Sequence, residues 1–140
     1  MSSDTQNTYS DSTIEKALAA IMFDAEGLVP AIAQQHDSGE VLMMAWMNAE
    51  AVSETLKTGQ VCYYSRSRQK LWRKGESSGQ TQTLVDFRMD CDGDTLLLQV
   101  AQKGVACHTG RHNCFFNAIR DDKIQIIADV ETDPKDLYGK

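Results

Sequence analysis

The sequence lacks the long apolar run, the basic surplus and the leader-like start that mark several classes of protein. Its longest apolar stretches, such as Val41–Met47, are far too short to span a bilayer. The polar start Met1-Ser2-Ser3-Asp4 predicts no signal peptide. The formal net charge of −6 argues against broad binding of nucleic acid, so an anionic ligand needs a local basic cluster or metal ions. We therefore expect neither a membrane nor a nucleic acid as a partner.

Internal repeats, linkers and changes of composition are also missing, which favours one domain. A chain of 140 residues with 41% hydrophobic and 24% charged residues has the usual size and composition of a globular domain. We expect residues 1–11 to be disordered, residues 12–130 to form the domain, and residues 131–140 to be an irregular tail.

The patterning predicts an α+β domain with mostly antiparallel or mixed strands and two or three helices. A capping box at Ser12-Thr13-Ile14-Glu15 predicts a helix through about Met22. Asn48 and Gly59 bracket a second helix over residues 49–58. The predicted strands cover residues 29–35, 41–46, 61–65, 80–90, 95–101, 114–120 and 123–130. Strict alternation along 80–90 places Leu84 and Asp86 on the same face.

Three aspartates at alternate positions, Asp90, Asp92 and Asp94, form a candidate cation site. On an extended chain their carboxylates share one face and repel one another, so a divalent cation is a natural partner. An acidic turn in solvent is an equally good interpretation of the spacing alone. An EF-hand is excluded, because Gly93 and Ala101 occupy the wrong loop positions for that motif.

Cys91, Cys107 and Cys114 are candidate zinc ligands, because thiolates suit zinc as oxygen ligands suit magnesium. On an extended chain Cys91 projects away from Asp90 and Asp92, so it does not share their cation. Cys107 and Cys114 are spaced more widely than the C-x2-C pairs of structural zinc fingers. Three thiolates leave one coordination position open, as in catalytic zinc sites.

His108 is the candidate proton carrier, because imidazole titrates near neutral pH. Two alternatives stay open at this stage. His108 or His112 could complete a closed structural zinc site with the three thiolates, or His108 could be a buried structural residue. Cys62, within an apolar strand, has the pattern of a core residue.

The stretch from Ser65 to Gly79 holds five of the fourteen lysines and arginines of this acidic chain. Arginine forks and glycine-exposed N–H groups suit phosphate, so we interpret residues 66–79 as a functional loop that binds an anion. A solvated surface loop is the alternative, although a tryptophan among glycines and charges is unusual there. The candidate substrate-binding residues are Arg66, Arg68, Trp72, Lys74, Glu76 and Ser77, with Arg111 further along the chain.

The order of these motifs resembles the phosphoribosyl-AMP cyclohydrolase family. The resemblance runs from about Val29 to Phe116. Its first motif is Ser65-Arg66-Ser67-Arg68 with Leu71-Trp72-x-Lys74-Gly75-Glu76-x-Ser78-Gly79, its second is Asp90-Cys91-Asp92-x-Asp94, and its third is Cys107-His108-Thr109-Gly110-Arg111 with Cys114-Phe115. Three motifs in this order at close spacing make the resemblance highly specific.

The resemblance implies hydrolysis of the N1–C6 bond in the adenine ring of N1-(5-phosphoribosyl)-AMP, the third step of histidine biosynthesis. It also implies an intertwined cytoplasmic homodimer with a barrel-like folded sheet. Asp90, Asp92 and Asp94 would then bind Mg²⁺. Cys107 and Cys114 would bind Zn²⁺ together with Cys91 of the partner subunit.

Two other functional classes are weighed against this interpretation. A zinc-dependent nucleotide hydrolase or deaminase is the nearest rival, but the H-x-E and P-C-x-x-C signature of nucleobase deaminases is absent. A zinc-stabilised binding module for nucleic acid is opposed by the net charge of −6 and by the lack of paired C-x2-C knuckles.

Overall fold

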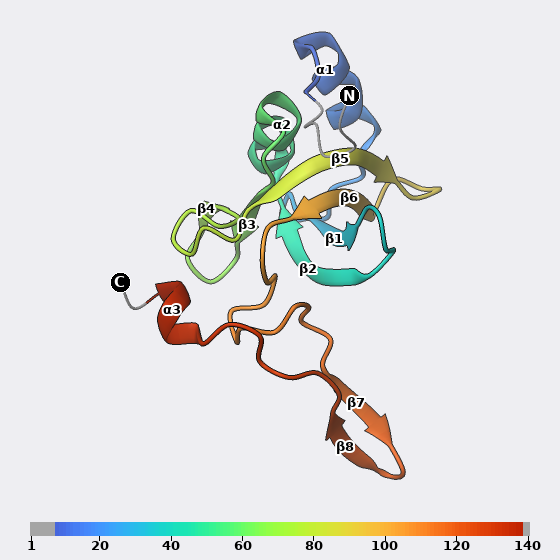
Figure 1. The fold of residues 1–140 in the computed structure, drawn as a ribbon. Helices are drawn as coiled ribbons and strands as arrows, with labels where there is room; N and C mark the ends of the chain where they lie inside the picture. Colours follow the sequence, from blue (N-terminus) through green and yellow to red (C-terminus); the bar gives the residue numbers. More distant parts are fainter. Residues whose placement is uncertain (1–7, 139–140) are drawn as a thin grey trace.

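Six strands form one curled sheet, with two longer helices on one side and a separate two-stranded hairpin near the C-terminus (Figure 1). The computed structural model describes residues 8–138. In chain order the elements are α1 (Asp11–Ala20), β1 (Val29–Gln35), β2 (Val41–Met47), α2 (Ala49–Thr58), β3 (Cys62–Ser65), β4 (Lys70–Arg73), β5 (Gln82–Met89), β6 (Leu96–Gln102), β7 (Asn117–Arg120), β8 (Lys123–Ile126) and α3 (Pro134–Tyr138). The predicted α+β class is confirmed.

The large sheet has the strand order β4-β3-β2-β1-β6-β5. Only β1 and β6 pair in parallel, and the other neighbours are antiparallel, so the sheet is mixed. The chain just before β3 reaches β5, where Val61 N donates to Gln82 O at 3.0 Å and Leu84 N donates to Gly59 O at 2.8 Å. These bonds curl the sheet into a half-barrel, which agrees with the expected barrel-like shape.

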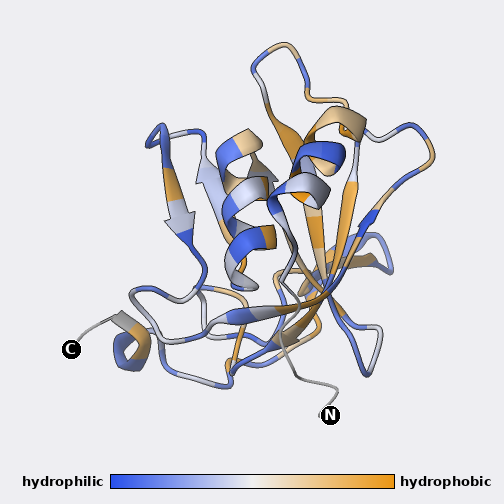
Figure 2. Cartoon of the chain, turned by 90° about the horizontal axis from the view of Figure 1, so that it is seen from above, coloured by the Kyte–Doolittle hydropathy of each residue, from blue (hydrophilic) through white to orange (hydrophobic). Residues whose placement is uncertain are grey.

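The core lies between the sheet and the two longer helices. Its fully buried side chains include Val29, Leu42, Tyr63, Leu84, Leu96, Leu98 and Val100. Ile14 of α1 and Leu56 of α2 pack into the same cluster. Figure 2 shows hydrophobic residues concentrated on the strands behind the helices, while the helices carry hydrophilic and hydrophobic residues in turn. Among residues 8–138, no helix is both long and apolar enough to span a membrane.

The two longer helices begin at side-chain caps. The cap of α2 is Asn48, whose side chain accepts a hydrogen bond from Ala51 N, and Gly59 ends the helix in the left-handed region, as predicted. The predicted start of α1 is wrong by two residues, because Ser10 caps the helix instead of Ser12. Tyr9 N also bonds Leu56 O at 3.0 Å, so the domain begins before residue 12. The rest of the predicted disordered segment, residues 1–7, lies outside the described part of the chain.

A β-bulge corrects the predicted faces of β5. Leu84 pairs with Val100, but Asp86 pairs with Gln99, so Val85 is an extra residue. Paired residues share a face, and neighbours along a strand face opposite ways. Leu84 and Asp86 therefore lie on opposite faces, and the bulge brings Phe87 onto the core face, where it packs against the core cluster.

Two segments predicted to be irregular contain regular structure. The functional loop over residues 66–79 includes β4. This strand pairs with β3, with Cys62 opposite Arg73 at one end and Ser65 opposite Lys70 at the other. The tail after residue 130 includes the short helix α3, and its Leu137 is buried. The predicted hairpin of residues 114–130 forms as β7 and β8, over a shorter range, and projects away from the sheet (Figure 1).

Candidate active site

A cleft of about 540 Å³ lies where the β3–β4 hairpin meets the loop that follows β6. His108 lines it from that loop, and the basic segment supplies the remaining wall. The lining residues are Ser65, Ser67, Arg68, Trp72, Arg73, Lys74, Gly75, Glu76, Ser77, Ser78 and His108. Five predicted substrate-binding residues and the predicted catalytic histidine thus share one cavity, although His108 is at least 30 positions from any of the others.

Trp72 is held in the cleft wall by the buried ring of Tyr63. The two ring centroids lie 5.0 Å apart, and Tyr63 is fully buried with its hydroxyl donating to Gln82 Oε1 at 2.7 Å. Burial raises the pKa of the Tyr63 phenol, so this hydroxyl stays a donor at neutral pH. The indole of Trp72 is therefore supported from behind and presented to the cavity.

Beneath the cleft, the Lys74 ammonium lies beside the thiols of Cys107 and Cys114. Lys74 is 9% exposed, and its Nζ donates to Ala106 O at 2.8 Å. Burial lowers the pKa of Lys74, while the two thiols oppose that shift. For Cys114, burial and the neighbouring Cys107 raise the thiol pKa to about 12. Lys74 is thus directed at the thiol pair, not at solvent where a phosphate would approach.

The thiol pair has the donor chemistry that zinc requires. Cys107 and Cys114 interact with each other, and Thr109 Oγ1 donates to Cys107 Sγ at 3.1 Å. Two adjacent thiols are suited to a soft cation, which stabilises both thiolates, and Cys114, whose ionisation burial opposes, gains most from it. The residues present therefore fit a zinc ion in donor type.

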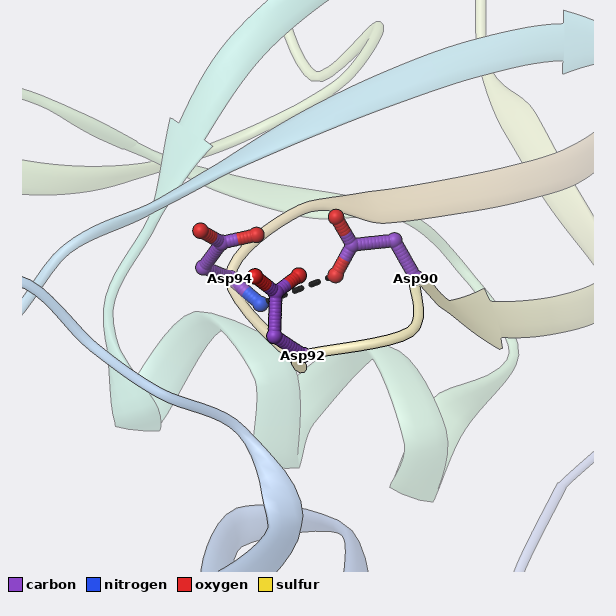
Figure 3. A group of neighbouring side chains, drawn as sticks. All are labelled: Asp90, Asp92 and Asp94. Carbon is purple, nitrogen blue, oxygen red and sulfur yellow. Dashed lines mark hydrogen bonds between the residues drawn. The ribbon is translucent and has the colours of Figure 1, made fainter.

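The three aspartates meet in the turn between β5 and β6, where their carboxylates point toward one another (Figure 3). All three offer a ligand oxygen within 4.8 Å of the others. The predicted extended chain through these aspartates is wrong, because residues 90–94 lie between the end of β5 and the start of β6. A turn brings them together, closed by Gly93 N to Asp90 O at 3.1 Å and by Asp94 N to Asp90 Oδ1 at 3.0 Å.

Gly93 is required where this turn packs against the end of α1. Its φ is +74°, and an added Cβ would lie 2.5 Å from Ala20 O. Gly93 O also accepts a hydrogen bond from Met22 N at 2.8 Å. Only a residue without a side chain fits there, so the aspartates are held on a fixed backbone.

The electrostatics of the turn also fit a cation. A hydrogen bond with Asp90 and the charges of Asp90 and Asp92 raise the pKa of Asp94. Desolvation opposes ionisation of Asp90, but hydrogen bonds from Asp94 and the turn backbone outweigh it and lower the pKa of Asp90. Asp94 therefore resists ionisation beside its neighbours, and a divalent cation would remove that repulsion.

Cys91 lies far from the other two cysteines within the chain. It is exposed and precedes β6, whereas Cys107 follows the far end of that strand. Seven residues of strand span about 20 Å at 3.3 Å per residue. The premise that Cys91 points away from the aspartates is wrong, because its thiol lies 3.6 Å from Asp92 Oδ1 in the turn, although Cys91 is not part of the aspartate cluster.

Two predicted substrate-binding arginines do not line the cleft. The Arg66 guanidinium stacks over the Trp46 ring, 4.6 Å from its centroid. Arg111 Nε donates to Ala128 O at 2.8 Å, and its guanidinium lies 4.1 Å from the Phe116 ring centroid. Arg68 is the predicted arginine that faces the cavity.

His112, the histidine nearest to His108, is held by a polar contact that was not predicted from the sequence. His112 Nδ1 lies 2.9 Å from a Glu40 carboxylate oxygen, and Asn113 Nδ2 donates to Glu40 at 2.7 Å. Burial acts to raise the pKa of Glu40, but these hydrogen bonds outweigh it and lower that pKa. Cys114 N also donates to Leu42 O at 2.8 Å, so two contacts fix the Cys114 segment to the β1–β2 hairpin. Glu40 is over 70 positions away, and no local pattern signals the pair.

A cavity that joins basic, acidic and imidazole side chains, with paired thiols nearby, has the groups that an enzyme active site uses. A family model described as phosphoribosyl-AMP cyclohydrolase matches residues 43–116. The chain belongs to the phosphoribosyl-AMP cyclohydrolase family, as the following relatives also show.

Three relatives carry the name phosphoribosyl-AMP cyclohydrolase. The protein of Alkalilimnicola ehrlichii is 69% identical over 123 residues, 88% of this chain and 87% of the relative. That of Paramagnetospirillum magneticum is 67% identical over 88% of this chain and 93% of its own length. That of Rhodospirillum centenum is 63% identical over 91% of this chain and 96% of its own length.

We predict that, as the pH is lowered, the affinity of this turn for Mg²⁺ begins to fall at a higher pH than the affinity of ordinary carboxylates would. Because the pKa of Asp94 is raised, Asp94 takes up its proton at a higher pH, and the protonated oxygen no longer attracts the cation. Calorimetric titration with Mg²⁺ at several pH values between neutral and mildly acidic conditions measures the effect. Asp94→Asn should bind Mg²⁺ more weakly and with a shallower pH dependence. An equally steep pH dependence in that variant would contradict the assignment.

Proposed function

We propose that the chain hydrolyses the bond between N1 and C6 in the adenine ring of N1-(5-phosphoribosyl)-AMP, the third step of histidine biosynthesis. One observation carries this proposal. Residues of two separate family motifs, Arg68, Trp72 and Glu76 on one side and His108 on the other, line a single cleft. Family membership names the reaction, and the cleft supplies a place for it.

His108 is proposed as the general acid and base. It is exposed at the cleft and directly follows Cys107, so a water held at the thiol pair would lie near its ring. Attack of water on C6 releases a proton, and opening of the ring requires one at N1. An imidazole that titrates near neutral pH can accept the first proton and deliver the second.

Recognition of the substrate is assigned to the basic wall of the cleft. Arg68 can pair with a phosphate through its planar fork, and Ser77 with a hydroxyl or phosphate oxygen. The Trp72 indole, backed by Tyr63, offers a flat face to the adenine ring. Glu76 is placed to orient a ribose hydroxyl or the ring amino group. Arg66, at the Trp46 edge, could reach a phosphate only by leaving its stacked position.

Zinc is proposed to bind Cys107 and Cys114 of one chain and Cys91 of the partner subunit. A bound zinc ion supplies Lewis-acid activation of water for attack at C6. The separation of about 20 Å along β6 supports a shared site, since one chain cannot bring all three thiols to one ion. The exposure of Cys91 supports it too, because a ligand donated to another chain must be accessible.

The homodimer that this requires has apolar surface to form it. Ile119, Ile124 and Ile126 of the β7–β8 hairpin are 84%, 74% and 60% exposed. Three large apolar side chains on a projecting hairpin are costly in water and favour burial against a second copy. The hairpin is therefore proposed as part of the dimer contact.

Magnesium is proposed at Asp90, Asp92 and Asp94, where it would supply positive charge for a phosphate or ribose oxygen of the substrate. In the proposed intertwined dimer this turn would approach the partner's cleft together with Cys91, its neighbour in the same turn. The acidic net charge of −6 and the proposed nucleotide substrate are consistent with a cytoplasmic enzyme that does not bind nucleic acid.

The direct test is product formation. Purified protein with Zn²⁺ and Mg²⁺ should convert N1-(5-phosphoribosyl)-AMP to the formimino-carboxamide ribotide, followed by the ultraviolet absorbance of the opened ring and by mass spectrometry. The product should be heavier than the substrate by one water. An unchanged substrate, with metals bound and the fold intact, would disprove the proposed function.

His108→Ala is expected to lower kcat by about 100-fold or more, the usual contribution of a general acid–base residue. Zinc content, measured by elemental analysis, should stay at the wild-type level because His108 lines the cleft and is not needed as a ligand. Thr109→Ala, a neighbour that bonds Cys107 through its hydroxyl, is the matched control and should lose less activity. Loss of zinc from the His108 variant would instead identify a closed site with His108 as its fourth ligand.

A further inference from the structure

The chain beyond the β7–β8 hairpin returns to the loop that carries His108. Ile127 N donates to Phe116 O at 2.8 Å, so the two ends of the hairpin lie side by side at its base. The following residues, 128–132, then run beside residues 107–111, as the red and orange segments below the sheet in Figure 1 show. The returning segment, but not the loop it contacts, lies outside residues 43–116, the part of the chain that the family model matches.

Three hydrogen bonds join the returning segment to the loop. Glu131 N and Thr132 N donate to Gly110 O at 2.8 and 3.0 Å. Arg111 Nε donates to Ala128 O at 2.8 Å. Gly110 and Arg111, the two residues that make these bonds, stand at the end of a short turn that begins at Cys107. Gly110 N donates to Cys107 O at 3.0 Å across this turn. His108 lies inside that turn.

Gly110 allows the two segments to touch. Its φ is +86°, and an added Cβ would lie 1.8 Å from Thr132 O. A backbone oxygen cannot yield as a flexible side chain can, so any larger residue would push the returning segment away. Gly27 has a similar φ of +77° with no atom within 4 Å of an added Cβ, so it isolates the cost of the backbone angle.

Arg111 belongs to this contact. Its guanidinium donates to Ala128 O and lies over the ring of Phe116. Phe116 is also the residue whose carbonyl accepts the hydrogen bond from Ile127 at the base of the hairpin. A side chain committed at both places is not available to a phosphate in the cleft, and Arg111 is not among the cleft-lining residues.

The far end of the segment is fixed as well. Leu137 of α3 is 5% exposed, and Asp136 N bonds Asp133 O at 2.8 Å. The segment is thus held at the hairpin and at α3, so residues 128–132 can restrain the loop between two fixed points.

We propose that residues 128–132 form a latch that positions His108, and that Arg111 and Gly110 are positioning residues of this latch. The inference rests on the proposed function, since it concerns how the catalytic loop is held for that reaction. A small displacement of a catalytic group reduces turnover strongly, whereas substrate contacts made by the opposite wall of the cleft are unaffected.

The test compares Thr132→Pro with Thr132→Ala in the full chain. Proline removes the N–H that bonds Gly110 O, whereas alanine removes only the side chain and keeps that donor. The proline variant should lower kcat by about 10- to 100-fold with KM within about twofold, and the alanine variant should resemble the wild type. Hydrogen exchange of residues 107–111 should accelerate in the proline variant alone, with exchange in β1 and β6 unchanged.

Arg111→Gln tests the latch from the loop side and serves if the proline variant fails to fold. It should lower kcat with KM nearly unchanged, and combining it with Thr132→Pro should add little further loss, because both changes break one contact. Gly110→Ala should show the same pattern, and Gly27→Ala should keep wild-type kcat and loop exchange.

Several results would overturn the latch. The first is a wild-type kcat, or wild-type hydrogen exchange of residues 107–111, in Thr132→Pro. The second is a loss of kcat in Thr132→Ala as large as in Thr132→Pro. The third is a raised KM as the main effect of Arg111→Gln, because Arg111 would then be a substrate ligand. Failure of the proposed function is distinguishable, because an inactive wild type would leave the exchange comparison intact as the test of the latch.

Discussion

The length of β6 is the constraint on which the rest of the arrangement depends. This strand is buried through Leu96, Leu98 and Val100 and lies between β1 and β5, so it can neither bend nor shift. The turn with Cys91 and the aspartates lies at its start, and the loop with Cys107 and His108 follows its end. With about 20 Å of strand between them, the two halves of the proposed metal site do not meet within one chain. Two copies are the simplest way to join them.

The cleft end of β6 is organised by contacts that come from distant parts of the sequence. Lys74 reaches Ala106 O from the basic segment, Glu40 holds His112 and Asn113 from the β1–β2 hairpin, and residues 128–132 return to Gly110 and Arg111. Each contact restrains the loop with His108 and the thiols from a different side. An acidic chain therefore has a local basic wall facing His108 across one cleft, as the proposed reaction of an anionic substrate requires.

The sequence predicts what local physics decides and misses what distant contacts decide. Asn48 and Gly59 bound α2 correctly, because a cap and a left-handed glycine act within a single turn of helix. The bulge at Val85 could not be predicted, since it depends on the register with β6. The predicted site residues Arg68, Trp72, Glu76 and His108 line one cleft, but the contacts of Arg111 and Lys74 were not predicted. Their side chains bond to Ala128 O and Ala106 O, and nothing in the local sequence marks those carbonyls.

The central claim, a zinc site shared between chains, is tested most directly by subunit complementation. Cys91→Ala and Cys107→Ala, each inactive alone, are mixed and allowed to exchange subunits. Each mixed dimer then has one site with intact Cys91, Cys107 and Cys114 and one site with both defects. Random exchange makes about half the dimers mixed, so about a quarter of wild-type activity should return. No recovery of activity, with subunit exchange confirmed by mass spectrometry, would contradict the shared site.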